Sequence, residues 1–79
     1  MLRQSIKAMI EVFKTNITNT EDAGKVALSL SRLQPHWFIH FDLQDVDRIL
    51  RIESERFDVD AIKVCHHLAK MGYEAQPLE

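Results

Sequence analysis

The sequence predicts an α+β sandwich in which strands and helices follow one another in the order βαββαβ. Apolar and polar residues alternate along residues 38–53, which is typical of a β-hairpin, and apolar residues recur at helical spacing along 23–33 and 61–71. A strand-like stretch lies before the first helical pattern and another follows the second. The chain can therefore be laid out as one strand and one helix on each side of a central hairpin.

The hairpin is expected from Phe38 to Glu53 because its two arms alternate in phase. In the first arm the apolar face consists of Ile39, Phe41 and Leu43, and the opposite face of Phe38, His40 and Asp42. In the second arm the apolar face continues with Leu50 and Ile52, while the residues facing away are Ile49, Arg51 and Glu53. The polar stretch 44–47, which contains two aspartates, is expected to form the turn.

The first strand is expected over residues 9–16, where β-branched and aromatic residues are frequent. Of its two rows, Phe13, Thr15 and Ile17 are expected to point inward, since the other row contains Lys14, which prefers solvent. The first helix then begins at one of two caps: Thr18, which has capping-box spacing to Glu21, or Thr20, which is followed by two acids.

Each helix has an apolar stripe and a clear end. The first ends at Pro35, and its stripe comprises Ala23, Val26, Ala27, Leu30 and Leu33, with Lys25, Ser29 and Arg32 turned outward. The second is capped by Asp58 or Asp60 and runs to about Lys70, with a stripe of Ala61, Val64, Cys65, Leu68 and Met71. Gly72 is placed to end it in a left-handed conformation, a short last strand is expected over 73–76, and Pro77 suits the edge of a sheet.

Composition places the chain among small globular proteins. We expect a flexible extension over residues 1–8 and one domain over 9–77. A net charge of −2 gives no basic surface for nucleic acid, and no apolar run is long enough to span a bilayer, so neither nucleic acid nor membrane is an expected partner. The first eight residues lack the apolar core of a signal peptide and Cys65 is the only cysteine, so we expect a cytoplasmic protein without a disulfide.

The predicted order of elements is that of a ferredoxin-like sandwich, with a four-stranded antiparallel sheet and two helices on one face. Within this class the segment Phe57–Ala75, which closes with Lys70-Met71-Gly72-Tyr73-Glu74-Ala75, resembles the last helix and strand of heavy-metal-associated domains. The resemblance extends over most of residues 10–75. It implies a scaffold shared with copper chaperones and metal-ATPase modules.

The metal motif of that family is missing from the matching loop. Where heavy-metal-associated domains carry Met-Thr-Cys-x-x-Cys after the first strand, residues 17–22 read Ile-Thr-Asn-Thr-Glu-Asp, so Asn19 and Asp22 replace both cysteines. An amide and a carboxylate are hard oxygen ligands, whereas copper(I) binds thiolates. Helix capping explains Asn19, Thr20 and Asp22 better than metal binding does, and the family function is not expected to follow the fold.

Other residues that could bind a metal are few. Cys65, His66 and His67 are successive on a helix and do not converge, so we interpret them as a core thiol beside two exposed histidines. His36 and His40 are weak metal candidates, as are Asn19 and Asp22. The sequence contains no evident nucleophile with a base and an orienting group, so neither an enzyme nor a cofactor is expected.

Two functional hypotheses remain. The first is a non-catalytic binding module that contacts another protein, or a second copy, through the sheet face away from the helices. Its contact residues would be Val12, Phe38, His40, Ile49 and Arg51, together with Lys14, as a patch with an apolar centre and a charged rim. The alternative is a divergent metal carrier or sensor, related to copper chaperones, that uses oxygen and nitrogen ligands such as Asp22, His36 or His40.

Overall fold

The computed structural model describes residues 9–56 and 58–78, so the flexible extension predicted for residues 1–8 lies outside the described residues. Its elements follow the order β1 (Met9–Thr15), α1 (Thr20–Leu33), β2 (Phe38–Asp42), β3 (Ile49–Ser54), α2 (Ala61–Lys70) and β4 (Ala75–Pro77). The predicted βαββαβ order is thereby confirmed.

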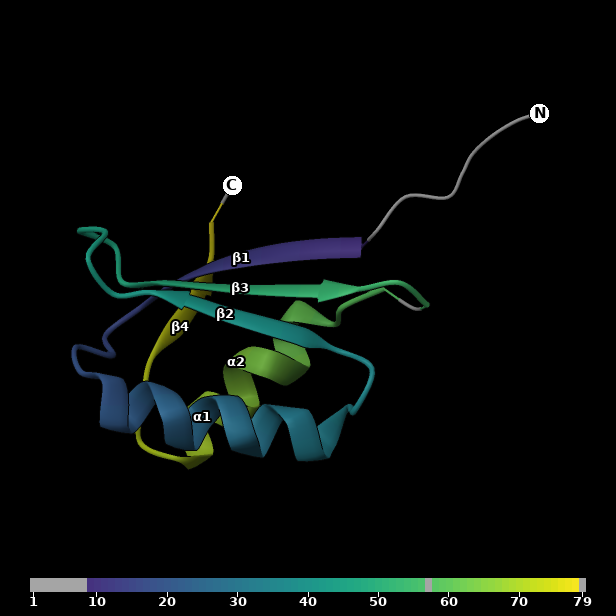
Figure 1. The fold of residues 1–79 in the computed structure, drawn as a ribbon, viewed down its shortest axis with the longest axis horizontal. Helices are drawn as coiled ribbons and strands as arrows, with labels where there is room; N and C mark the ends of the chain where they lie inside the picture. The colour runs from purple at the N-terminus through teal and green to yellow at the C-terminus, as the bar shows by residue number, and fades with distance from the viewer. Residues whose placement is uncertain (1–8, 57, 79) are drawn as a thin grey trace.

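The strands form one antiparallel sheet in the order β2-β3-β1-β4. Both helices lie on the same side of this sheet, α1 against β2 and α2 against β4 (Figure 1). This is the ferredoxin-like arrangement. Its other side carries neither helix.

Helix α1 begins at Thr20, one of the two expected starts, but neither threonine is its cap. Asn19, between them, is the N-cap: its backbone is extended, and its side-chain oxygen accepts a hydrogen bond from the Asp22 N–H at 2.8 Å. Asn19 Nδ2 also donates to the Asp22 carboxylate at 3.0 Å. An asparagine oxygen caps at least as well as a threonine hydroxyl, so the reciprocal pair places the cap one residue from either threonine. At the other end, the extended Gln34 before Pro35 ends α1 as predicted.

Helix α2 and strand β4 follow their local signals with one shift. Asp60 caps α2, accepting from the Lys63 N–H at 3.2 Å, and Gly72 has the expected positive φ, 94°. Strand β4 comprises Ala75–Pro77 rather than residues 73–76. Pro77 lies opposite Phe13, and its neighbour Leu78 donates its N–H to the Val12 carbonyl at 2.7 Å. Because hydrogen-bonded pairs alternate along an antiparallel ladder, the Pro77 nitrogen faces the open edge, where its missing N–H breaks no ladder bond.

The core lies between the inner face of the sheet and the two helices. Its fully buried side chains are Phe13, Leu50 and Ile52 from the strands, Ile17 from the loop after β1, and Val26, Leu30, Val64 and Leu68 from the helices. The inward rows predicted for β1, β2 and β3 are confirmed, and Trp37 is buried against the same core. Leu33 differs: it is 36% exposed, because it lies at the last turn of α1, toward the open groove beside α2.

Candidate functional site

The candidate site is the sheet face without helices, which we call the outer face. It consists of Ile10, Val12 and Lys14 from β1, Phe38, His40 and Asp42 from β2, and Ile49, Arg51 and Glu53 from β3. The strand register arranges these residues in three rows across the sheet: Phe38–Glu53–Ile10, His40–Arg51–Val12 and Asp42–Ile49–Lys14. Every residue that the sequence assigned to this surface lies in one of these rows.

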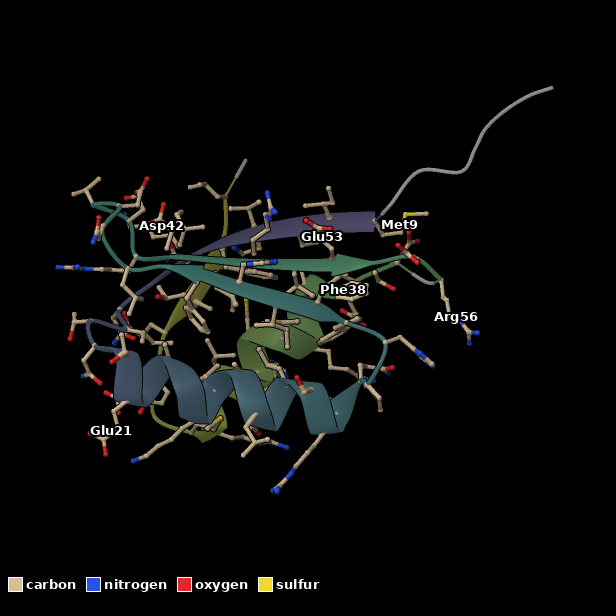
Figure 2. All side chains as sticks on the ribbon, in the orientation of Figure 1. Met9, Glu21, Phe38, Asp42, Glu53 and Arg56 are labelled. Carbon is tan, nitrogen blue, oxygen red and sulfur yellow. The ribbon has the colours of Figure 1, made fainter. Side chains whose placement is uncertain are left out.

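Apolar side chains are unusually open on the outer face. Phe38 is 54% exposed and Ile10 50% exposed, at the two ends of one row, and Val12 and Ile49 are partly buried. Ile10 was not among the predicted contact residues, although its alternation with Phe13 placed it on this side. Figure 2 shows Phe38 and Glu53 at the same end of the sheet as Met9. The outer face therefore offers apolar surface on three neighbouring strands.

The centre of the outer face is charged, which corrects the expected apolar centre. Arg51 Nη2 and Glu53 Oε2 are 2.8 Å apart, and both residues lie on β3, an interior strand of the sheet. Residues two apart on a strand point to the same face, so both charges of this interior strand lie on the outer face. The apolar groups lie around this pair, on both flanking strands and next to it on β3.

Near the end of β1, Lys14 Nζ is 4.0 Å from Asp47 Oδ1, at the limit of an ion pair. Asp47 belongs to the hairpin loop, where its N–H donates to the Asp45 carboxylate at 2.8 Å, as expected of a turn built on aspartates. The tip of this loop exposes Val46 by 89%. Charged and polar groups thus border the outer face at its hairpin end.

The loop that would hold a metal in heavy-metal-associated domains is occupied by capping bonds. Asn19 and Asp22 are bonded to each other, and both are at the surface. Asp22 also influences Tyr73, whose phenol has a pKa above its usual value. Desolvation raises this pKa most, followed by the hydrogen bond to Asp22, the charge of Asp22 and the charge of Glu21. These two candidate ligands therefore already have partners within the fold.

The four histidines do not converge: His36 and His40 lie on separate parts of the surface, and His66 and His67 are successive on α2. His36 lies in the α1–β2 connection and His40 on the outer face, and both are exposed. Across residues 9–56 and 58–78, no three His, Cys, Asp or Glu side chains are grouped so that they could hold a metal ion. The structure does not bring the predicted metal candidates together with a third such ligand.

One histidine has a role that the sequence did not reveal. His67 Nε2 lies 2.6 Å from Ser29 Oγ, so these two partly buried residues link α2 to α1, and the outward position expected for each is wrong. In each helix, polar residues lie on both flanks of the apolar stripe. The sequence does not show which of these flanks meets the neighbouring helix, because tertiary packing decides it. Ser29 lies in the middle of α1, where backbone N–H groups are used by the helix, so an oxyanion hole cannot form there from its own backbone.

Two further features lie in the helix layer: the Cys65 thiol and a hollow beside α2. Cys65 is partly buried beside the core, and desolvation raises the pKa of its thiol, which reduces the thiolate fraction. A hollow of about 370 Å³ lies between the end of α1 and α2, lined by Leu33, Ile62, Lys63, His66 and Lys70 among others. It is shallow, and cationic groups on one exposed helix face are ordinary for a solvated surface.

No helix among the described residues is long and apolar enough to cross a membrane. Comparison with known proteins gives no match to a family model, to a curated protein or to a solved structure. The fold is therefore assigned from its topology.

Proposed function

We propose that the chain is a non-catalytic protein-binding module that uses the outer face. The observation that carries the proposal is the pair of half-exposed apolar side chains, Phe38 and Ile10, that flank the Arg51–Glu53 ion pair on one continuous sheet surface. Aromatic residues and arginine are enriched in protein interfaces relative to the remaining surface.

The partner is a protein surface that is apolar and carries both signs of charge. Arg51 and Glu53 neutralise each other, so the partner does not need a net charge to bind here. It would cover Phe38, Ile10 and Val12 with apolar groups and offer an acid to Arg51 or a base to Glu53. Charge pairs of this kind select orientation and partner more than they add affinity.

The scaffold is proposed to be a divergent heavy-metal-associated domain. The βαββαβ order and the Lys70–Ala75 ending support this origin. For the alternative function, a metal carrier or sensor, residues 9–56 and 58–78 group no three His, Cys, Asp or Glu side chains that could hold a metal ion. Asn19 and Asp22 are bonded to each other in the helix cap. Binding through the sheet is therefore favoured over binding through the loop.

The test compares lysine substitutions on two exposed apolar sites. Phe38→Lys and Ile49→Lys on the outer face should abolish capture of the partner, which is identified by cross-linking and mass spectrometry with wild-type protein. Leu28→Lys is the matched control, because Leu28 on α1 is 55% exposed and faces solvent on the helix layer. Phe38→Lys and Leu28→Lys should each change the free energy of unfolding by under about 0.5 kcal/mol. Ile49→Lys, at a partly buried side chain, should change it by less than about 1.5 kcal/mol.

Two outcomes would contradict the proposal. One is loss of capture by Leu28→Lys to the same degree as by Phe38→Lys, since the contact would then not be specific to the outer face. The other is an unchanged amide spectrum of residues 10, 38, 49 and 51 when the captured partner is added to labelled protein.

A further inference from the structure

The two edges of the sheet differ in how well they are protected. Strand β4 at one edge has only three residues and includes Pro77. Strand β2 at the other edge has five residues, Phe-Ile-His-Phe-Asp, with neither proline nor lysine. Natural proteins commonly protect edge strands with proline, lysine or very short strands, because unpaired backbone groups there recruit another strand. By these criteria the β2 edge is open.

The strand register identifies which backbone groups are open. Successive residues of a strand turn their N–H and C=O groups to opposite neighbours. The Val12 carbonyl bonds to Leu78 beside β4, so the even-numbered residues of β1 face β4 and the odd-numbered ones face β3. Following the register through β3 to β2 leaves the N–H and C=O groups of Ile39 and Phe41 directed at the open edge.

We propose that a second copy of this chain pairs with this edge, β2 antiparallel to β2, about a two-fold axis at His40. Ile39 then lies opposite Phe41 of the second copy, and the two residues exchange two N–H···O=C hydrogen bonds. By symmetry, Phe41 forms the same pair with Ile39 of the second copy. His40 lies opposite itself, and Phe38 opposite Asp42. The two sheets become one sheet of eight strands, and all five residues of β2 are paired.

Packing favours this register over its neighbours. The Ile39 and Phe41 side chains lie on the inner face and are only partly buried in one chain. In the proposed register each meets the other across the junction, which makes two apolar cross-strand pairs. A shift by two residues in either direction pairs fewer residues of β2, so fewer backbone hydrogen bonds form across the junction.

Charge is complementary under the same symmetry. One end of the β2 edge is acidic on balance: Asp42 lies there with Glu21 of the first turn of α1 (Figure 2), and Asp45 follows in the hairpin loop. One arginine, Arg48, lies at the same end, where its side chain donates to the Leu43 carbonyl. The other end is basic, with Arg32 in the last turn of α1. A two-fold axis at the middle of β2 brings the acidic end of each copy to the basic end of the other.

Helix α1 leaves room beneath this junction. Ser29 marks the side of α1 that meets α2, and at helical spacing Gly24, Ala27 and Ser31 fall on the opposite flank, toward β2. Nothing lies within 4 Å of the position that a Gly24 Cβ would take, so no contact inside the chain requires glycine there. Small residues along this flank let a second α1 approach closely and antiparallel.

This contact lies on the sheet edge, so it goes beyond the binding function proposed for the outer face. Two five-residue strands with a flanking helix form a small interface, of the size below about 1,200 Å² that is typical of transient association. We therefore expect a reversible dimer that is populated at high micromolar to millimolar concentration.

The first experiment uses the symmetry of the register. In a Cys65→Ala background, His40→Cys should form an interchain disulfide under mild oxidation, because residue 40 opposes itself in a non-hydrogen-bonded pair, where Cα atoms lie about 4.5 Å apart. Phe38→Cys and Asp42→Cys are the matched controls, since each opposes a different residue. Selective cross-linking at position 40, read on a non-reducing gel, is the expected result; equal cross-linking at all three positions, or none at 40, overturns the register.

The second experiment measures association directly. Sedimentation of wild-type protein over roughly 10 µM to 1 mM should show a monomer–dimer equilibrium. His40→Lys should raise its dissociation constant at least tenfold by placing like charges across the axis, whereas Gln76→Lys at the β4 edge should leave it unchanged. Ile49→Lys, which removes outer-face binding, should also leave it unchanged, so the two proposals can fail separately. A wild-type chain that stays monomeric at 1 mM, or a dimer that Ile49→Lys dissociates, overturns the proposal.

Discussion

The two faces of the sheet have similar alternation in sequence and opposite environments in the fold. On the inner face, Phe13, Leu50 and Ile52 are fully buried, whereas on the outer face Phe38 and Ile10 expose half of their surface. Adjacent residues of β3 show the contrast most directly: Leu50 has no exposed surface and Ile49 is only partly buried. The difference teaches that apolar residues on strands have two uses here: stability on one side and surface for contact on the other.

The largest test of this contrast compares truncation of adjacent residues on β3. Leu50→Ala should lower the free energy of unfolding by about 2–5 kcal/mol, because it removes buried methyl groups and leaves a cavity among fully packed neighbours. Ile49→Ala should cost less than about 1.5 kcal/mol, because the outer face can fill with water. Urea unfolding followed by the fluorescence of Trp37, the only tryptophan, gives both values. Equal losses would show that the outer face is packed as tightly as the inner one.

A smaller effect is expected at the polar end of the inner face. Thr15 is 8% exposed; its hydroxyl donates to the Arg48 carbonyl at 2.6 Å and accepts from the Ile17 N–H at 3.2 Å. Thr15→Val preserves volume but leaves both backbone groups without this partner, which should cost about 1–3 kcal/mol. Thr18→Val at the exposed next threonine is the control and should cost under about 0.5 kcal/mol. A neutral Thr15→Val would mean that these two hydrogen bonds add no net stability to the fold.

The inner face could be predicted because one local rule determines it. Alternation set Phe13, Leu50 and Ile52 inward, and Pro35 and Gly72 ended the helices where their backbone preferences require. Strand β4 was placed two residues early because its bounds depend on the register with β1, which is not a property of residues 73–77 themselves. Local periodicity defines a face; pairing across the sheet defines an end.

The members of the candidate site could be predicted, with the exception of Ile10, but their arrangement could not. Alternation identified the outer-face residues, yet it could not show that Arg51 and Glu53 form an ion pair on an interior strand, with apolar groups around it. The Ser29–His67 contact could not be predicted for a related reason. A serine or histidine on a polar side of a helix is expected to face solvent, and only the position of the second helix shows that it does not. These contacts depend on how strands and helices are placed beside one another, which the periodicity of a single element does not show.

The smallest expected effect on stability concerns the ion pair itself. The side chains of Arg51 and Glu53 are 47% and 29% exposed, and pairs in such positions contribute little, because solvent screens them and ordering two long side chains costs entropy. Glu53→Gln should therefore change the free energy of unfolding by under about 0.5 kcal/mol in urea unfolding.

The same substitution should have a much larger effect on binding through the outer face. When a partner covers this surface, water leaves the pair, and Arg51 without Glu53 becomes an uncompensated charge among apolar groups. We expect Glu53→Gln to weaken partner binding at least tenfold, while Arg51→Met with Glu53→Gln recovers part of the loss, because both charges are then removed. Asp42→Asn, at the border of the same face, is the control and should change binding less than threefold. If Glu53→Gln destabilises the free chain as much as it weakens binding, the ion pair belongs to the fold and the two faces do not divide stability from contact.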